Sequence, residues 1–152
     1  MERKRENGWQ VCPSHSFQIF VKLMLFIVTF AKKITMTNKI YYLASCDTCR
    51  KIIKSLPNSN MLTFIDIRQN PISESDLEEM YQLSGSYEVL FRKKAQLYKS
   101  LDLKNKNLKE DDYKKYLLEH YTFLSRPVFI IENNIYIGNS QKNINEVIKV
   151  LS

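Results

Sequence analysis

The sequence is poor in glycine and proline, with 3 and 4 copies in 152 residues, and it contains no internal repeat and no low-complexity tract. Hydrophobic residues make up 44% of the chain and charged residues 26%, a composition that excludes a disordered chain. A chain of this length has room for one domain of ordinary size with a hydrophobic core. We therefore expect one globular domain.

Cysteine is also rare, and its 3 copies exclude a secreted disulfide scaffold, which carries regularly spaced cysteines in even number. Cys46 and Cys49 form one CxxC motif, and Cys12 stands alone. The chain has no second CxxC pair and no closely spaced pair of histidines, whereas tetrahedral zinc needs four ligands. The motif therefore favours redox chemistry over a metal site, and we assign no role to His15 or His120.

Residues 1–35 differ in composition from the rest of the chain. A charged start precedes an apolar run from Phe17 to Ala31, which Lys22 interrupts and which is therefore too short to span a bilayer. The run could be the core of a signal peptide, but no small-x-small cleavage site follows it. We interpret residues 1–35 as an N-terminal extension, disordered or due to a misassigned start, and expect translation to begin at Met36.

The net charge of +7 belongs largely to that extension, which holds six basic and two acidic residues. Residues 36–152 hold 17 basic and 14 acidic residues, a mild excess. Charge therefore does not indicate a nucleic-acid partner. For residues 36–152 we expect no direct contact with nucleic acid or membrane.

Hydrophobic patterning predicts strands and helices in regular order from Lys39 onwards. The predicted strands are residues 40–44, 61–67, 128–131 and 135–137, and the predicted helices start near residues 49, 73, 86, 108 and 140. The helix that follows the first strand covers residues 49–56, so the first two strands should be parallel with a right-handed crossover. The order is β-α-β, a helical insert over about residues 72–122, then β-β-α.

Short local signals support these boundaries. Ser73 and Asp76 have the spacing of a helix capping box, and Asn139 or Ser140 is expected to cap the last helix. Asn133-Asn134 is expected to form the tight turn of the final hairpin. The outer elements compose an α/β, thioredoxin-like sheet, and the middle of the chain is an inserted helical subdomain. Its aromatic stripe is interpreted as core: Tyr113, Tyr116, Leu117 and Tyr121.

The position of Cys46 between a strand and a helix favours a reactive thiolate. A free cysteine has a pKa of ~8.5, and the positive end of a helix dipole lowers it. Arg50 and Lys51 add positive charge nearby, and Cys49 lies one turn further along the helix. The motif therefore offers an attacking thiolate and a resolving thiol. Two small residues filling a strand-helix junction are the simpler alternative.

Two further motifs have both a structural and a functional interpretation. Arg126-Pro127 stands before the third strand, and a proline at the edge of a strand loses little by its missing N–H; in thioredoxin-like folds a cis-proline at this place faces the CxxC motif. The run from Phe91 to Lys94 is expected at the end of a helix. Its cations are either a solvated basic turn or a clamp for an oxyanion, because arginine offers a planar fork to such groups.

Three stretches together resemble the glutaredoxin-like arsenate reductase family, which includes the Spx-type transcription regulators. They are residues 45–51 (SCDTCRK), 90–98 (LFRKKAQLY) and 124–128 (LSRPV). The likeness runs from about Lys39 to Leu151. In the reductases the first cysteine, here Cys46, attacks arsenate, and arginines matching Arg92 and Arg126 bind the oxyanion; glutathione then attacks the arsenylated cysteine and glutaredoxin completes the reduction.

Three positions depart from the reductase pattern. Asn139 is the nearest match to a third arginine, Tyr42 stands where the reductases have a histidine, and Cys49 is a second cysteine of the kind that Spx-type regulators have.

The resemblance implies a cytoplasmic thiol oxidoreductase. Cys46 is the nucleophile, Cys49 the resolving thiol, Arg92 and Arg126 the substrate-binding residues and Pro127 the cis-proline. The resemblance implies no tightly bound cofactor or metal. Glutathione or thioredoxin is the expected reductant. The expected partners are a small oxyanion or thiol substrate and the protein glutaredoxin or thioredoxin. The alternatives are a redox-sensing regulator that binds RNA polymerase, and a structural remnant without activity.

Overall fold

The computed structural model describes residues 38–152. The predictions for residues 1–35, together with Cys12 and His15, lie outside these residues. Within residues 38–152 no helix is long and apolar enough to cross a membrane.

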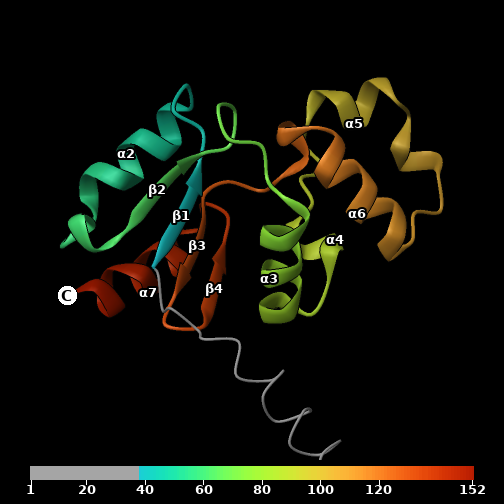
Figure 1. Cartoon of the computed structure of the whole chain (residues 1–152). Helices are drawn as coiled ribbons and strands as arrows, with labels where there is room; N and C mark the ends of the chain where they lie inside the picture. Colours follow the sequence, from blue (N-terminus) through green and yellow to red (C-terminus); the bar gives the residue numbers. More distant parts are fainter. Residues whose placement is uncertain (1–37) are drawn as a thin grey trace, which may run out of the picture. The chain divides into compact units, whose positions relative to one another are not determined.

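A four-stranded mixed sheet forms the centre of this part of the chain (Figure 1). Its strands are β1 (Lys39–Tyr42), β2 (Thr63–Asp66), β3 (Val128–Ile131) and β4 (Asn134–Ile137). The strand order is β2-β1-β3-β4, with β1 parallel to β2 and antiparallel to β3, and β3 antiparallel to β4. The predicted β-α-β unit and the final hairpin are therefore both confirmed.

The helices fall into an outer pair and an inserted group (Figure 1). The outer pair is α2 (Asp47–Ser55) and α7 (Gln141–Leu151). The insert contains α3 (Glu74–Ser84), α4 (Tyr87–Leu90), α5 (Gln96–Ser100) and α6 (Glu110–Glu119). Short 3₁₀ helices are η1 (Ser59–Met61), η2 (Leu103–Asn105) and η3 (Tyr121–Phe123).

The two faces of the sheet pack against different helices, because side chains alternate along a strand. Ile40 of β1 and Phe129 of β3 belong to a core that includes residues of α2 and α7. Tyr41 of β1 and Val128 of β3 belong to the other core, which the insert completes. The predicted helical insert thus shares its core with the sheet instead of forming a separate hydrophobic unit.

The predicted helix caps are confirmed, and the predicted hairpin turn is shifted by one residue. Ser73 and Asp76 form the predicted capping box, and Ser140, not Asn139, caps α7 by accepting a hydrogen bond from the Asn143 N–H. The hairpin turn falls one residue earlier than predicted, at Glu132 and Asn133, whose φ angles are 49° and 67°. Pairing of β4 with β3 begins at Asn134, which faces Ile131, and this register leaves only two residues for the turn.

The prediction of one helix over residues 86–94 is wrong. Helix α4 ends at Leu90, because Phe91 forms an isolated antiparallel bridge with Leu124. The chain then starts a new short helix, α5, that the sequence pattern did not indicate. Of the predicted stripe, Tyr113 and Leu117 are buried in the core, and Tyr116 and Tyr121 are half-buried against it. Phe91 joins this core, stacked on Phe123 with ring centroids 5.0 Å apart.

Candidate active site

Helix α2 begins directly after Cys46, which occupies its N-cap position with extended φ and ψ angles of −92° and 115°. The Cys46 N–H donates to the Leu43 carbonyl and the Arg50 N–H donates to the Cys46 carbonyl, both at 3.0 Å. Asp47 in the first turn and Lys54 in the last turn complement the helix dipole. Strand β1 and this cap together place the Cys46 sulfur at the helix N-terminus, as predicted.

The two thiols of the motif differ in exposure and acidity. Cys46 is half-buried and Cys49 is fully buried. Partial burial opposes ionisation of Cys46, but the nearby Cys49 N–H, Cys49 thiol and Thr48 N–H, together with the charge of Arg126, lower its pKa. Burial raises the pKa of Cys49, and its hydrogen bond to Cys46 adds to this effect. Cys46 is therefore the thiol suited to attack, and Cys49 is the proton donor beside it.

The cation that acts on Cys46 is Arg126. We expected Arg50 and Lys51 to supply this charge, but both side chains are exposed and Arg50 forms an ion pair with Asp47 on the helix surface. Arg126 precedes β3 and is joined to Pro127 by a cis peptide bond, as the resemblance implies. A cation from a distant part of the chain thus stabilises the Cys46 thiolate, which sequence proximity to the motif does not indicate.

Within residues 38–152, two of the three side-chain nitrogens of Arg126 have no hydrogen-bond partner. Its Nε and Nη1 atoms are buried, and neither has a hydrogen-bond partner among residues 38–152. Burial and the nearby charge of Arg92 lower the pKa of Arg126, while the two thiols of Cys46 and Cys49 act in the opposite direction. A buried guanidinium with unused donors is costly unless an anion meets it. This side chain is therefore a candidate oxyanion ligand.

Arg92 is held near Arg126 by a backbone contact between its segment and the segment before β3. Beside the bridge between Phe91 and Leu124, the Arg92 N–H donates to the Phe123 carbonyl at 2.7 Å and the Ser125 N–H donates to the Leu90 carbonyl at 2.8 Å. Arg92 is half-buried and close enough to Arg126 to depress its pKa. The structure thus brings Arg126 near both thiols, and Arg92 near Arg126.

Tyr42 and Asn139, two of the positions that depart from the reductase pattern, do not join this cluster of thiols and arginines. Tyr42 lies on the opposite face of β1, where it packs with the α2 and α7 core and meets Phe64 edge-on at 5.9 Å. Asn139 is exposed, just before the N-cap of α7. Tyr42 therefore does not take the place of the missing histidine at the thiols.

The sequence pattern predicts Tyr121 only as a core residue and gives His120 no role. Tyr121 is half-buried and lies near enough to Arg126 to influence its pKa. His120 stacks on Tyr121 with ring centroids 4.6 Å apart, and its Nδ1 lies 2.7 Å from the Thr122 Oγ1. Closeness to the Arg126-Pro127 dipeptide is the only signal in the sequence that points to Tyr121.

Among residues 38–152, no three His, Cys, Asp or Glu side chains are grouped as a metal site would need.

The sheet order, the CxxC motif at the start of α2 and the cis-proline before β3 define a thioredoxin-like protein. A sequence model of the ArsC family matches residues 41–147, and the chain belongs to this family.

Its relatives include both enzymes and regulators. An arsenate reductase of Haemophilus influenzae is 28% identical over 112 residues, which cover 72% of this chain and 97% of the relative. The global transcriptional regulator Spx 2 of Bacillus anthracis is 25% identical over 109 residues, 69% of this chain and 82% of the regulator.

Solved structures share the fold. An ArsC family related protein from Bacteroides fragilis superposes with a TM-score of 0.64 at 22% identity, covering 74% of this chain and 98% of its own. An arsenate reductase from Vibrio cholerae superposes with a TM-score of 0.62 at 24% identity, covering 76% and 98%. These likenesses bear on the fold alone.

Proposed function

We propose that the chain is a thiol-dependent oxidoreductase that reduces an oxyanion or a disulfide at Cys46. The observation that carries the proposal is the buried, unpartnered face of Arg126 beside the acidic thiol of Cys46. Family membership and the arsenate reductases among the relatives support the same reaction class. Arg92 and Arg126 hold the anion, and their charges offset its negative charge during attack.

With arsenate as substrate, the proposed reaction balances within the CxxC pair. The Cys46 thiolate attacks arsenic and forms a sulfur–arsenic bond, while one arsenate hydroxyl takes a proton from solvent and leaves as water. The Cys49 thiol gives its proton to solvent and attacks the Cys46 sulfur, so that the sulfur–arsenic bond breaks, arsenite leaves with the electron pair and arsenic is reduced by two electrons. The product is a Cys46–Cys49 disulfide, which glutathione with glutaredoxin, or thioredoxin, would reduce. In the monothiol variant, glutathione attacks the arsenylated Cys46 instead.

The deciding assay is arsenate-dependent NADPH oxidation, coupled through glutathione, glutaredoxin and glutathione reductase, and repeated with a thioredoxin system. Cys46→Ser should abolish turnover in both systems. Cys49→Ser should abolish it only if a dithiol mechanism operates. Arg92→Ala and Arg126→Ala should raise KM, whereas the exposed Arg68→Ala is the matched arginine control and should leave KM unchanged. Turnover that survives Cys46→Ser would contradict the proposal.

A second candidate function is a redox-sensing regulator that binds RNA polymerase. The likeness to Spx 2 and the buried Cys49 thiol beside Cys46 favour it, since both thiols are free and can form a switch. A regulator would show no turnover with either reductant, yet its affinity for RNA polymerase would change when Cys46 and Cys49 are oxidised. For either function we propose the cytoplasm as the location, because its reducing conditions keep such thiols available.

A further inference from the structure

The anion site is assembled from two parts of the chain that must be held at a fixed distance. Cys46 follows β1, and Arg92 belongs to the insert that packs on one face of the sheet. Most of the contact between these parts is apolar, and apolar contact has little directionality. Polar contacts between the sheet and the insert are therefore the features that set their relative orientation.

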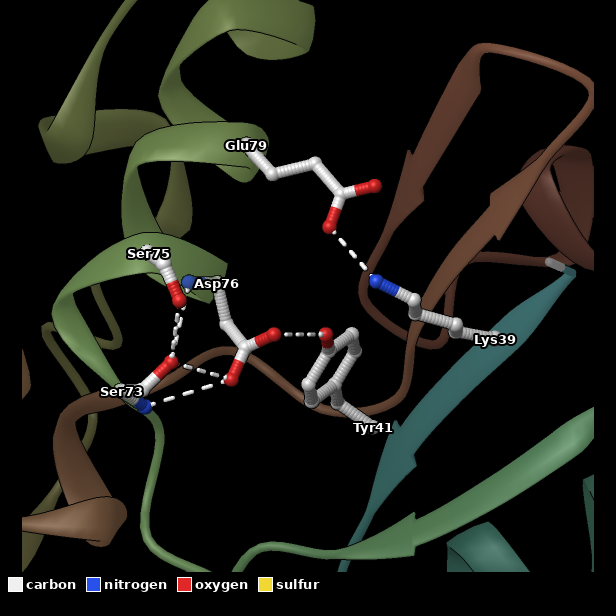
Figure 2. Close-up of polar contacts among 6 residues, drawn as sticks. All are labelled: Lys39, Tyr41, Ser73, Ser75, Asp76 and Glu79. Carbon is white, nitrogen blue, oxygen red and sulfur yellow. Dashed lines mark hydrogen bonds and ion pairs between the residues drawn. The ribbon is translucent and has the colours of Figure 1, made fainter. Parts of the chain in front are cut away.

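Figure 2 shows two such contacts between β1 and α3. The Tyr41 hydroxyl donates to the Asp76 Oδ1 at 3.0 Å, and the Lys39 Nζ lies 2.7 Å from the Glu79 Oε2. Lys39 and Tyr41 are two residues apart on β1, so their side chains project to the same face of the strand. Asp76 and Glu79 are three residues apart on α3 and lie on one side of the helix. The two pairs thus form a two-point attachment between strand and helix.

The contact between Tyr41 and Asp76 is the more constrained of the two. Tyr41 is fully buried, whereas Lys39 and Glu79 keep 21% and 41% of their side-chain surface exposed. Asp76 is held in place by the α3 cap, since its Oδ2 accepts from the Ser73 Oγ at 2.6 Å. Burial first, and then the neighbouring carboxylate of Asp76, raise the pKa of Tyr41, so its hydroxyl stays a donor at every pH of interest. This pair is therefore a permanent, directional hydrogen bond.

Tyr41 also stands at the junction of the two segments that carry the site. On β1 it comes shortly before Cys46, and across the ladder it faces Val128, which follows the Arg126–Pro127 bond. The bridge between Phe91 and Leu124 ties the middle of the insert to the segment before β3. The bond to Asp76 ties the first helix of the insert, at the start of α3, to β1. These directional contacts, added to the shared apolar core, fix the orientation of the insert and with it the position of Arg92.

We propose that Tyr41 and Asp76 are positioning residues, whose hydrogen bond sets the separation between the Arg92-bearing insert and Cys46 for anion binding. The inference rests on the proposed function of the site. Neither residue takes part in the chemistry, and the Cys46 thiolate is stabilised by groups of α2 and by Arg126, which this bond does not touch. Loss of the bond should therefore weaken anion binding without changing the reactivity of the free thiol.

The test is protection of Cys46 by arsenate against iodoacetamide, followed by mass spectrometry of the Cys46 peptide in the full chain. Tyr41→Phe removes only the hydroxyl and should raise the half-protecting arsenate concentration about fivefold or more. Its alkylation rate without arsenate, and the pH midpoint of that rate, should equal those of the wild type. Asp76→Ala should have the same effect on protection, and Tyr41→Phe should add nothing in that background.

The matched control is Tyr87→Phe. The Tyr87 hydroxyl also donates to a carboxylate of α3, the Glu78 Oε2, at 3.0 Å, but both partners lie inside the insert. This variant should change the melting temperature without changing the protection. If arsenate protects Cys46 in the Tyr41→Phe and Asp76→Ala variants as well as it does in Tyr87→Phe, the positioning role is wrong while the anion site stands. Absence of protection in the wild type overturns the proposed anion site, and the positioning role with it.

Discussion

Phe91 lies opposite Leu124 in a single antiparallel bridge that joins the two arginine-bearing segments. Arg92 follows Phe91 directly, and Arg126 comes shortly after Leu124, so one short backbone contact sets two guanidinium groups near each other although α5 and α6 lie between them in the chain. Like charges repel, and neither Nε nor Nη1 of Arg126 has a partner among the described residues. The arrangement is stable because the ring of Phe91 packs into the insert core on Phe123 and Tyr113.

This packing leads to a first prediction, for Phe91→Ala. Removing a buried phenylalanine should lower the free energy of unfolding by about 3–5 kcal/mol. Because the same residue holds the backbone of Arg92, protection of Cys46 by arsenate should weaken as well. Urea unfolding and the alkylation assay measure the two effects. Val89→Ala is the control, since Val89 is 55% exposed on the neighbouring helix and should change neither. Unaltered anion protection in a folded Phe91→Ala protein would contradict the role of the bridge.

A second prediction concerns the pH dependence of the thiols. The pKa of Cys46 is lowered, so its alkylation rate should rise with pH to a midpoint below the ~8.5 of a free thiol. Cys49→Ala removes the thiol that donates to Cys46, and should move this midpoint upward. Limiting iodoacetamide near neutral pH should label Cys46 before Cys49, whose pKa is raised. Peptide mapping reads out both sites, and faster labelling of Cys49 would reverse the assigned roles.

Arg126 allows a prediction in which stability and binding move in opposite directions. Arg126→Met keeps the length of the side chain and removes a charge whose buried Nε and Nη1 have no partner in residues 38–152. We expect the free energy of unfolding to stay the same or rise by ~1 kcal/mol, because no hydrogen bond is lost. Anion protection should be lost, and the pKa of Cys46 should rise. Arg126→Lys should restore only part of the protection.

A loss of stability in Arg126→Met as large as that of a core truncation would mean that the guanidinium has partners that the structure does not show. Thermal unfolding with and without arsenate separates the two contributions. Arg68→Met, on an exposed arginine, serves as the control for removing one positive charge.

The cap of α7 gives a paired prediction. The Ser140 Oγ accepts a hydrogen bond from the Asn143 N–H, whereas the preceding Asn139 lies outside the helix. Ser140→Ala should therefore lower the free energy of unfolding by about 1 kcal/mol, and Asn139→Ala should leave it nearly unchanged. Equal effects of the two substitutions in urea unfolding would show that the cap is shared.

The start of the chain gives the last prediction. We expect a protein beginning at Met36 to keep its melting temperature and its Cys46 reactivity, because residues 38–152 cover both faces of the sheet by themselves. Differential scanning fluorimetry of the two forms measures this directly. A large loss of stability, or detection of residues 1–35 in the protein isolated from its native cell, would contradict the proposed start.

The sequence by itself determined the features that depend on neighbouring residues. The CxxC motif, the β-α-β order, the capping box at Ser73 and the core role of the Tyr113 stripe could all be inferred, because periodicity and capping act within a few turns of chain. The short motifs around Cys46, Arg92 and Arg126 were also enough to indicate the family. The register of the final hairpin could not be inferred in this way. The turn lies at Glu132-Asn133 and not at Asn133-Asn134, because the pairing of β4 with β3 decides which residues remain for the turn.

Tertiary structure alone decided which side chains meet. Helix α4 stops at Leu90 because Phe91 finds a backbone partner in Leu124, which follows α6 and η3 in the chain. Arg126, and not the adjacent Arg50 or Lys51, acts on Cys46, because β3 lies beside β1 while Arg50 faces outward to Asp47. Tyr41 reaches Asp76 because α3 packs against that face of β1. Such contacts join residues that are far apart in the chain, and their partners are chosen by packing on the sheet, which no local pattern encodes.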